Sequence, residues 1–436
     1  MYLIVSGGPY GLEAALGSAG LQITALLCLL APFVLSVPVA LMAAELTALL
    51  PSEGGFYFWV KEAFGPFLGF TEAYLTILYT AVDMAIYPTL FAAYLSFLIP
   101  LGEPVKLVAG LAVIWVAGLL NIAGVRPTGR VSTVLACAVL VPFVVLAILG
   151  PWSVASLRAM FSGVGSAILG GSTGDLRSHL TALSAALSVV IWNFCGWENL
   201  SVAAGEIEQP RRNYLRAVLV AIPLVWAVYL IPLAVSAAVH ADYAKWTTGS
   251  FAELGVRVGG EYLGGAIAVG GGLSSFAVFT ASLLWVSRLP FVLALDGYLP
   301  QSMARLWAPA QTPARTIIVC CVVFSCLVPL GFVNLVVLDV LFYMTALALE
   351  MAALVRLRRV RPEREGLFRI GGGPLTLYLI AAAPLGVWLL SLGLALSAGM
   401  NLFEVASALV LAGAVVPVYW LCRRSFGGLP SASVDP

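Results

Sequence analysis

Long apolar stretches alternate with short polar segments along the whole chain. A helix needs about 20 apolar residues to cross a bilayer, and ten stretches reach that length: 21–50, 66–99, 105–123, 131–150, 214–239, 264–287, 314–333, 334–355, 374–397 and 401–422. Two further segments, 1–17 and 183–205, are apolar but interrupted. The pattern predicts an all-α integral membrane protein with 12 transmembrane helices.

Composition agrees with this fold class. Of the 436 residues, 61% are hydrophobic and only 10% are charged, and the mean hydropathy is +1.02. Soluble domains carry about 25% charged residues, so this composition indicates an integral membrane protein. We therefore expect most of the protein surface to contact the lipid bilayer. The net charge of +1 gives no case for binding nucleic acid.

The basic residues predict the orientation. If 12 spans leave both termini on one side, 17 of the 22 Lys and Arg residues fall on that side, and the positive-inside rule makes it the cytoplasm. The other side then holds only Lys106, Arg158, Arg177, Lys245 and Arg257. We therefore expect a multi-pass plasma-membrane protein with both termini in the cytoplasm.

The two interrupted segments indicate a binding site. The first carries Gly7, Gly8 and Pro9, which cannot hold a regular helix. The second carries a polar and aromatic patch from Trp192 to Asn199. Unwound backbone at membrane depth is tolerated where it lines a cavity or is buried in protein. Two broken helices at corresponding places in two halves are the best sequence indication of a transporter's central site.

Acidic residues lie in or beside apolar stretches where no Lys or Arg accompanies them. They are Glu13, Glu72, Asp83, Glu198 and Glu350. A carboxylate at membrane depth costs about 2.5–3.5 kcal/mol, so it usually marks a cavity, a relay or a ligand site. The expected counter-charge is a proton or a cationic substrate. Two of these residues also have a non-functional explanation. Glu72 could be solvated near the cytoplasmic end of its helix, and Glu350 could extend toward Arg356.

Polar residues at helical spacing form stripes on three of the predicted helices. A stripe several turns long fits a lined pathway better than a single buried hydrogen bond. The stripes are Glu72, Thr76, Tyr79, Asp83 and Tyr87 on 66–99; Asp339, Tyr343, Ala346 and Glu350 on 334–355; and Ser274, Val278, Ser282 and Trp285 on 264–287.

Six blocks of glycine, proline, acidic and aromatic residues occur in order along the first 372 residues. The blocks are Val5-Ser6-Gly7-Gly8-Pro9-Tyr10-Gly11-Leu12-Glu13, Pro51-Ser52-Glu53-Gly54-Gly55-Phe56-Tyr57, Phe64-Gly65-Pro66-Phe67-Leu68-Gly69-Phe70, Asp83-Met84-Ala85-Ile86-Tyr87-Pro88, Gly205-Glu206-Ile207-Glu208-Gln209-Pro210-Arg211-Arg212-Asn213, and Leu295-Asp296-Gly297-Tyr298-Leu299-Pro300 followed by Thr312-Pro313. Together they resemble the amino acid–polyamine–organocation superfamily, and the first and fourth resemble its polyamine:cation symporter branch. The resemblance covers roughly residues 1–372.

The resemblance implies a 5+5 inverted-repeat fold like that of the leucine transporter, with helices 1 and 6 broken. The divisions are 1–150 for the first repeat, 151–182 for an extracellular loop, 183–357 for the second repeat, 373–423 for helices 11 and 12, and 424–436 for a cytoplasmic tail. The superfamily also has a cytoplasmic tail before helix 1. Met1 falls inside that helix, so we expect either coding sequence upstream or a shortened inner gate.

The breaks, the stripes and the adjacent aromatic residues define the expected substrate site. Its members are Ser6, Gly7, Gly8, Pro9, Glu13, Asp83, Tyr87, Trp192, Asn193, Trp197, Glu198, Trp285 and Tyr343. Each aromatic side chain has an equal alternative role in packing. Amino acid carriers of this fold hold the substrate carboxylate on free N–H groups at the first break. Pro9 removes one donor and Glu13 adds a like charge, so both favour an amine. An ammonium about 4 Å from a carboxylate gains roughly 4 kcal/mol before desolvation.

The expected function is cation-coupled uptake of a polyamine or another amine by alternating access. Alternatives are a neutral or cationic amino acid permease and a non-transporting nutrient sensor. A proton, carried by Glu13, Glu72, Asp83 or Glu350, is favoured for coupling. Sodium would need backbone carbonyls at the first break with hydroxyls such as those of Ser274 or Ser275.

The sequence gives no indication of an enzyme. The only histidines are His179 and His240, both in predicted outside loops, and no GxSxG, HExxH or P-loop motif occurs. Seven cysteines form no CxxC pair, which argues against structural zinc and disulfides. We expect no cofactor and no metal.

Overall fold

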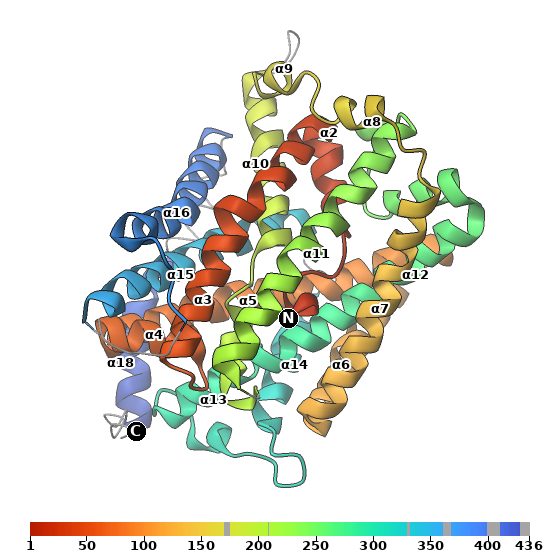
Figure 1. Ribbon diagram of the computed structural model, residues 1–436. Coiled ribbons are helices and arrows are strands. Elements are labelled where there is room, and N and C mark those ends of the chain that lie inside the picture. Colours follow the sequence, from red (N-terminus) through yellow and green to blue (C-terminus); the bar gives the residue numbers. More distant parts are fainter. Residues whose placement is uncertain (170–174, 208, 329–331, 361–367, 399–409, 428–436) are drawn as a thin grey trace.

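The computed structural model describes residues 1–436 except 170–174, 208, 329–331, 361–367, 399–409 and 428–436 (Figure 1). Over the described residues, the regular structure is helical apart from one isolated β-bridge between Trp307 and Thr312. Nine helical stretches in this part of the chain are long and apolar enough to cross a membrane. The prediction of an all-α membrane protein is therefore confirmed, whereas the number of 12 spans stays a prediction.

The first third of the chain begins with a four-residue helix and continues with long apolar helices. Its elements are α1 (Tyr2–Val5), α2 (Leu12–Ala31), the π-helix η1 (Pro32–Ser36), α3 (Val37–Leu49), α4 (Gly55–Phe64), α5 (Pro66–Leu98), α6 (Glu103–Ala123) and α7 (Val125–Leu149).

The rest of the chain repeats this alternation of short and long helices. Its elements are α8 (Val154–Ala159), α9 (Val164–Ile168), α10 (Leu176–Phe194), the 3₁₀-helix η2 (Asn199–Glu206), α11 (Pro210–Ala238), η3 (Tyr243–Lys245), α12 (Ser250–Val286), α13 (Arg288–Leu295), η4 (Gln301–Ala304), α14 (Ala314–Leu327), α15 (Phe332–Val360), α16 (Gly373–Ser397) and α18 (Val415–Phe426).

Both predicted interruptions leave the helical conformation. Between α1 and α2 the chain is non-helical, and Gly8 and Gly11 have φ angles of 99° and 96°. After α10 ends, Gly196 has a φ angle of 86°. This left-handed region is readily adopted by glycine and costly for other residues, so the glycines fix where each helix stops.

Several helix starts differ from the sequence predictions. Helix α7 begins at Val125 rather than 131, α10 at Leu176 rather than 183, and α12 at Ser250 rather than 264. The missed turns are more polar than the apolar stretch that follows, and hydropathy alone does not detect them. Helix α10 therefore extends into the predicted loop 151–182. Helix α12 consists of two helical segments joined at a kink, where Gly259 and Gly260 have non-helical angles, and the predicted stretch 264–287 begins just after this kink.

The helices that carry the polar stripes meet at α5, which lies near the middle of the view in Figure 1 and packs against both α12 and α15. Helix α5 packs against α12, α15, α4 and α6, and α10 packs against α2, α15 and α16. The outer helices instead expose apolar side chains, as a lipid-facing surface requires. Examples are Leu119 of α6, Val134 and Ile148 of α7, Val319 of α14 and Leu379 of α16.

Candidate functional site

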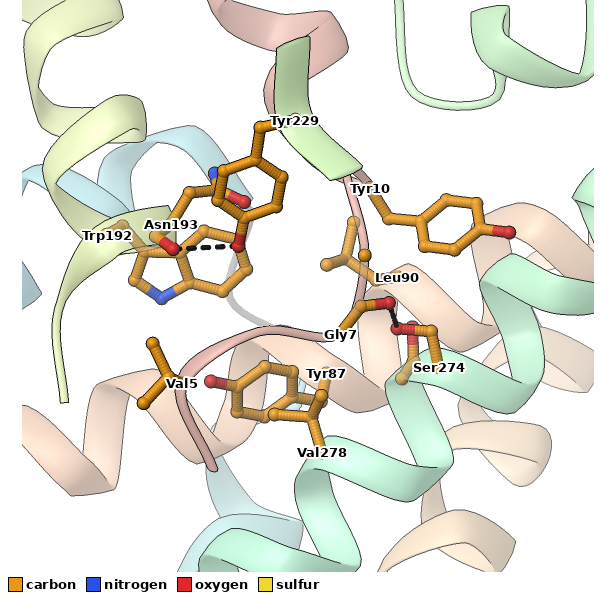
Figure 2. Close-up of a pocket in the computed structure, with 12 residues that line it drawn as sticks. Val5, Gly7, Tyr10, Tyr87, Leu90, Trp192, Asn193, Tyr229, Ser274 and Val278 are labelled. Atoms are coloured by element: carbon orange, nitrogen blue, oxygen red, sulfur yellow. Dashed lines mark hydrogen bonds between the residues drawn. The ribbon is translucent and has the colours of Figure 1, made fainter. Parts of the chain in front are cut away.

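A small cavity lies between the two helix breaks (Figure 2). Its volume is about 30 Å³, which is room for roughly one water molecule. The central site is therefore closed in this conformation. The cavity is lined by Val5, Gly7, Gly8, Tyr10, Tyr87, Leu90, Trp192, Asn193, Tyr229, Ser274, Ser275 and Val278.

The first break packs tightly against α12. Figure 2 shows the loop crossing between Trp192 and this helix, with Gly7 facing Ser274. The Ser274 hydroxyl donates a hydrogen bond to the Gly7 carbonyl. A Cβ atom on Gly7 would clash with the side chains of Ser274 and Val278. The Ser6 hydroxyl accepts a bond from the Gly8 N–H at 3.1 Å, so local polar groups take up part of the unwound backbone.

The second break is held by side chains that bond the last carbonyls of α10. The Phe194 carbonyl accepts from Trp197 Nε1 at 2.9 Å and from Ser36 Oγ at 3.3 Å. Ser36 ends the π-helix η1, which places its hydroxyl at the broken helix end. The Tyr229 hydroxyl donates to the Asn193 carbonyl at 2.7 Å. These bonds satisfy carbonyl groups that a helix end leaves without intrahelical partners.

Asp83 lies behind the aromatic wall of the cavity. Its carboxylate accepts from Trp192 Nε1 at 2.8 Å and from the Tyr87 hydroxyl at 3.0 and 3.1 Å. The rings of Tyr87 and Trp192 are stacked, with centroids 5.9 Å apart and an interplanar angle of 29°. One carboxylate thus positions two side chains that line the cavity.

Two tyrosines connect α5 and α15 beside the second break. The rings of Tyr79 and Tyr343 meet edge to face, with centroids 5.4 Å apart. Tyr343 donates to Glu198 Oε2 at 3.3 Å and accepts from the Gly196 N–H at 3.2 Å. Tyr79 donates to Asn199 Oδ1 at 3.3 Å. The break is therefore tied to both long helices.

Three buried glutamates interact on the other side of this tyrosine pair. Glu72, Glu198 and Glu350 are 0%, 1% and 3% exposed and lie within electrostatic range of one another. Thr76 donates to Glu72 Oε1 at 2.7 Å. The two alternative explanations for these residues are wrong. Glu72 is buried rather than solvated. Arg356 lies over the Phe64 ring, 5.0 Å from its centroid, rather than against Glu350.

Glu13 is fully buried and both of its carboxylate oxygens are occupied. Oε2 accepts from the Gly11 N–H and Oε1 from the Tyr94 hydroxyl, each at 2.7 Å. The neighbouring Tyr10 donates to the Ile267 carbonyl at 2.8 Å, and its ring meets that of Tyr94 at 5.0 Å. Glu13 therefore joins the first break to α5 through Tyr94.

Ion pairs outside the cavity tie α4 to the end of α13 and α3 to α15. Lys61 forms an ion pair with Asp296 at 2.5 Å, and Tyr57 donates a hydrogen bond to the same carboxylate. Burial and the neighbouring Asp296 carboxylate raise the pKa of the Tyr57 phenol, so it stays a donor at neutral pH. Arg358 makes a bidentate pair with Glu45 at 2.5 and 2.6 Å.

The structure brings most of the expected site residues together, but only some of them line the cavity. Gly7, Gly8, Tyr87, Trp192 and Asn193 line the cavity. Others lie behind this lining, in the two breaks or on the helices that hold them: Ser6, Pro9, Glu13, Asp83, Trp197, Glu198 and Tyr343. Trp285 lies elsewhere, with its ring against Phe56 of α4 at 6.2 Å. Binding by any of them stays a prediction.

The expected site lacks seven lining residues. Ser274, Ser275 and Val278 are expected only on the 264–287 stripe or as sodium ligands, and Val5, Tyr10, Leu90 and Tyr229 are not expected in the site at all. Tyr229 left a signal, because it is a hydroxyl-bearing residue between Pro223 and Pro232 in an otherwise apolar stretch. Tyr10 stands in a quoted motif, but its position depends on the contact with α12. Leu90 and Val5 are apolar and carry no sequence signal of a site.

Comparisons with known proteins show which sequences this chain resembles. The family model for amino acid permeases matches residues 1–420. The chain is 32% identical over 383 residues to Polyamine transporter RMV1 of Arabidopsis thaliana, covering 87% of this chain and 76% of that protein. It is 30% identical over 414 residues to Polyamine transporter PUT1 of Oryza sativa subsp. japonica, covering 93% and 75%. An uncharacterized transporter of Legionella pneumophila is 29% identical over 368 residues, covering 79% and 77%.

Proposed function

The chain belongs to the amino acid permease family, and from that premise we propose that it is a secondary active transporter of polyamines or related amines. It works by alternating access in the plasma membrane, taking up its substrate together with a cation. The names of its plant relatives, two of which are polyamine transporters at 30% and 32% identity, support the substrate class.

One observation carries this proposal. Buried carboxyl groups lie behind the cavity lining and beyond the Tyr79–Tyr343 pair, and among the described residues no Lys or Arg forms an ion pair with Asp83, Glu72, Glu198 or Glu350. The ion pairs that do form involve other acidic residues, such as Asp296 and Glu45. Buried charges without a partner are costly. A cationic substrate or protons would compensate them, whereas a free carboxylate on the substrate would increase the repulsion.

Within the site, different residues take different roles. Asp83 attracts the ammonium group and positions Tyr87 and Trp192, whose aromatic faces provide cation–π contacts. Gly7 and Gly8 let the backbone approach the substrate closely. Glu13 holds the first break in shape through Gly11 and Tyr94.

The two breaks also support the inverted-repeat arrangement. Residues 1–150 form the first repeat and 183–357 the second, each with a broken helix near its start. Helices in 373–423 lie outside the repeats, the connection between α7 and α10 is extracellular, and the end of the chain after 423 is cytoplasmic. The orientation follows the basic residues, with both termini in the cytoplasm and 12 spans in total.

A proton is the proposed coupling ion. Several buried carboxyl groups, Asp83 among them, have no basic partner among the described residues, and each can accept a proton. The Ser274 and Ser275 hydroxyls donate to the Gly7 and Gly271 carbonyls and keep lone pairs that a sodium ion could use, so the choice of a proton rests on the carboxyl groups.

Gradient experiments with purified protein in proteoliposomes test coupling and transport together. We expect uptake of radiolabelled putrescine to accelerate when the exterior is acidified and to be unchanged by an inward sodium gradient. Uptake that is driven by the sodium gradient instead would show that sodium, and not a proton, is the coupling ion. Specific binding of putrescine without uptake under any gradient would identify a nutrient sensor instead.

A further inference from the structure

Helices α5 and α15 place acidic residues at matching heights. Tyr79 and Tyr343 are in ring contact, which fixes the register between the two helices. Asp83 follows Tyr79 by four residues, and Asp339 precedes Tyr343 by four. Asp83 and Asp339 also lie within electrostatic range of each other, as expected if the helices run antiparallel. Residues four apart share a helix face, so both carboxyl groups lie one turn from the tyrosine pair, on the same side.

The same register applies in the other direction. Glu72 precedes Tyr79 by seven residues and Glu350 follows Tyr343 by seven, and these carboxyl groups also lie within electrostatic range of each other. Seven residues are two helical turns, so the pair again faces the same seam. We call Asp83 and Asp339 the aspartate level, and Glu72, Glu198 and Glu350 the glutamate level. The two levels lie on opposite sides of the tyrosine pair.

Both levels contain carboxylate oxygens that no hydrogen bond satisfies. Among the described residues, Asp339 Oδ1, Glu72 Oε2, Glu198 Oε1 and Glu350 Oε2 are buried and lack a hydrogen-bond partner. Buried polar atoms in native proteins are nearly always paired, so each such oxygen requires an explanation. In the described part of the chain, no three acidic, His or Cys groups come close enough to hold one metal ion. An extended organic cation would reach several carboxylates in turn.

The spacing of the levels specifies a length. From Glu72 to Asp83 is 11 residues, a rise of about 16 Å at 1.5 Å per residue. An extended chain advances about 1.2 Å per bond. A tetraamine of the spermine type, with thirteen bonds between its terminal nitrogens, therefore spans about 16 Å, whereas putrescine with five bonds spans about 6 Å. Between the levels, the Tyr79 and Tyr343 rings provide aromatic surface for methylene groups and inner ammonium groups.

We propose that the aspartate and glutamate levels are the two ends of one extended site that selects long linear polyamines over short diamines. This inference rests on the proposed function. A terminal ammonium binds at the aspartate level, behind the cavity, and the other terminal ammonium reaches the glutamate level once the closed site opens. A short diamine contacts only the aspartate level.

A length series tests this proposal in proteoliposomes containing the full chain. Putrescine, 1,8-diaminooctane, 1,12-diaminododecane and spermine compete with radiolabelled spermine, using wild type, Glu350→Gln and Asp83→Asn. In wild type, we expect affinity to rise with length. Glu350→Gln should weaken spermine and 1,12-diaminododecane by about tenfold or more and putrescine by less than about twofold. Asp83→Asn should weaken every amine.

The controls separate the possible failures. Glu72→Gln changes a residue of the same level and should cause the same length-selective loss. It provides the test if Glu350→Gln fails to fold. Glu103→Gln replaces a side chain that is 86% exposed and should leave every affinity unchanged. Equal losses for short and long amines in Glu350→Gln, or no loss at all, would overturn the extended site. If wild type binds no amine of any length, the proposed function itself fails.

Discussion

The indole N–H of Trp192 donates a hydrogen bond to the Asp83 carboxylate at 2.8 Å. These residues are 109 positions apart and come from α10 and α5, so the bond joins the second helix break to the polar stripe. Tyr87 bonds the same carboxylate and stacks on Trp192. A change at Asp83 therefore alters both the charge of the site and the shape of its aromatic wall.

Replacement of Asp83 by Asn tests the charge. The Asn side chain keeps an acceptor for Trp192 but removes the negative charge, so we expect amine uptake to fall by about tenfold or more. Uptake of radiolabelled putrescine measures this, and size-exclusion behaviour in detergent checks folding. Glu103→Gln serves as the matched control. Wild-type uptake by the Asn variant would remove Asp83 from the site.

Gly7→Ala tests the close approach of the first break to α12. The added Cβ would clash with Ser274 and Val278, so we expect loss of uptake and thermal destabilisation. Gly265→Ala on α12 is the matched control because its Cβ meets nothing within 4 Å. There, Ala should be neutral or stabilise the helix by up to about 1 kcal/mol. Equal behaviour of the two variants would contradict the packing at Gly7.

Glu13→Gln tests whether Glu13 shapes the break. Both carboxylate oxygens accept hydrogen bonds, and the amide NH₂ of Gln would face one of these donors. We expect uptake of putrescine and spermidine to fall by a similar factor, because the break is disturbed for every substrate. The ratio of the two uptake rates, compared with wild type, is the measurement. A loss confined to one amine would instead place Glu13 in contact with the substrate.

The Lys61–Asp296 pair should stabilise the closed conformation. The two side chains are 15% and 11% exposed, so their interaction is weakly screened. We expect Asp296→Asn to destabilise the protein by about 1–3 kcal/mol. A double-mutant cycle with Lys61→Met, followed by thermal unfolding in detergent, isolates the pair. Additive single and double mutants would show that the two residues are not coupled.

Features that depend on local backbone chemistry were predictable from the sequence. Gly7, Gly8 and Pro9 fixed the first break, and the four-residue spacing of Asp83 and Tyr87 placed them on one face of α5. Helix starts in polar sequence were not predictable, because hydropathy does not detect the first turns of α10 or α12. The hydrogen-bond partner of Glu13 was not predictable either, because Tyr94 lies 81 residues away in the sequence. The match between Asp83 and Asp339 requires the register of two packed helices.

Competition among substrates tests the central claim most directly. Wild-type protein in proteoliposomes, under an acidic exterior, takes up radiolabelled spermidine in the presence of unlabelled putrescine, spermine or leucine. The account predicts saturable uptake that putrescine and spermine inhibit far more strongly than leucine does. If leucine outcompetes the polyamines, the polyamine assignment is contradicted and the protein is a permease for neutral amino acids.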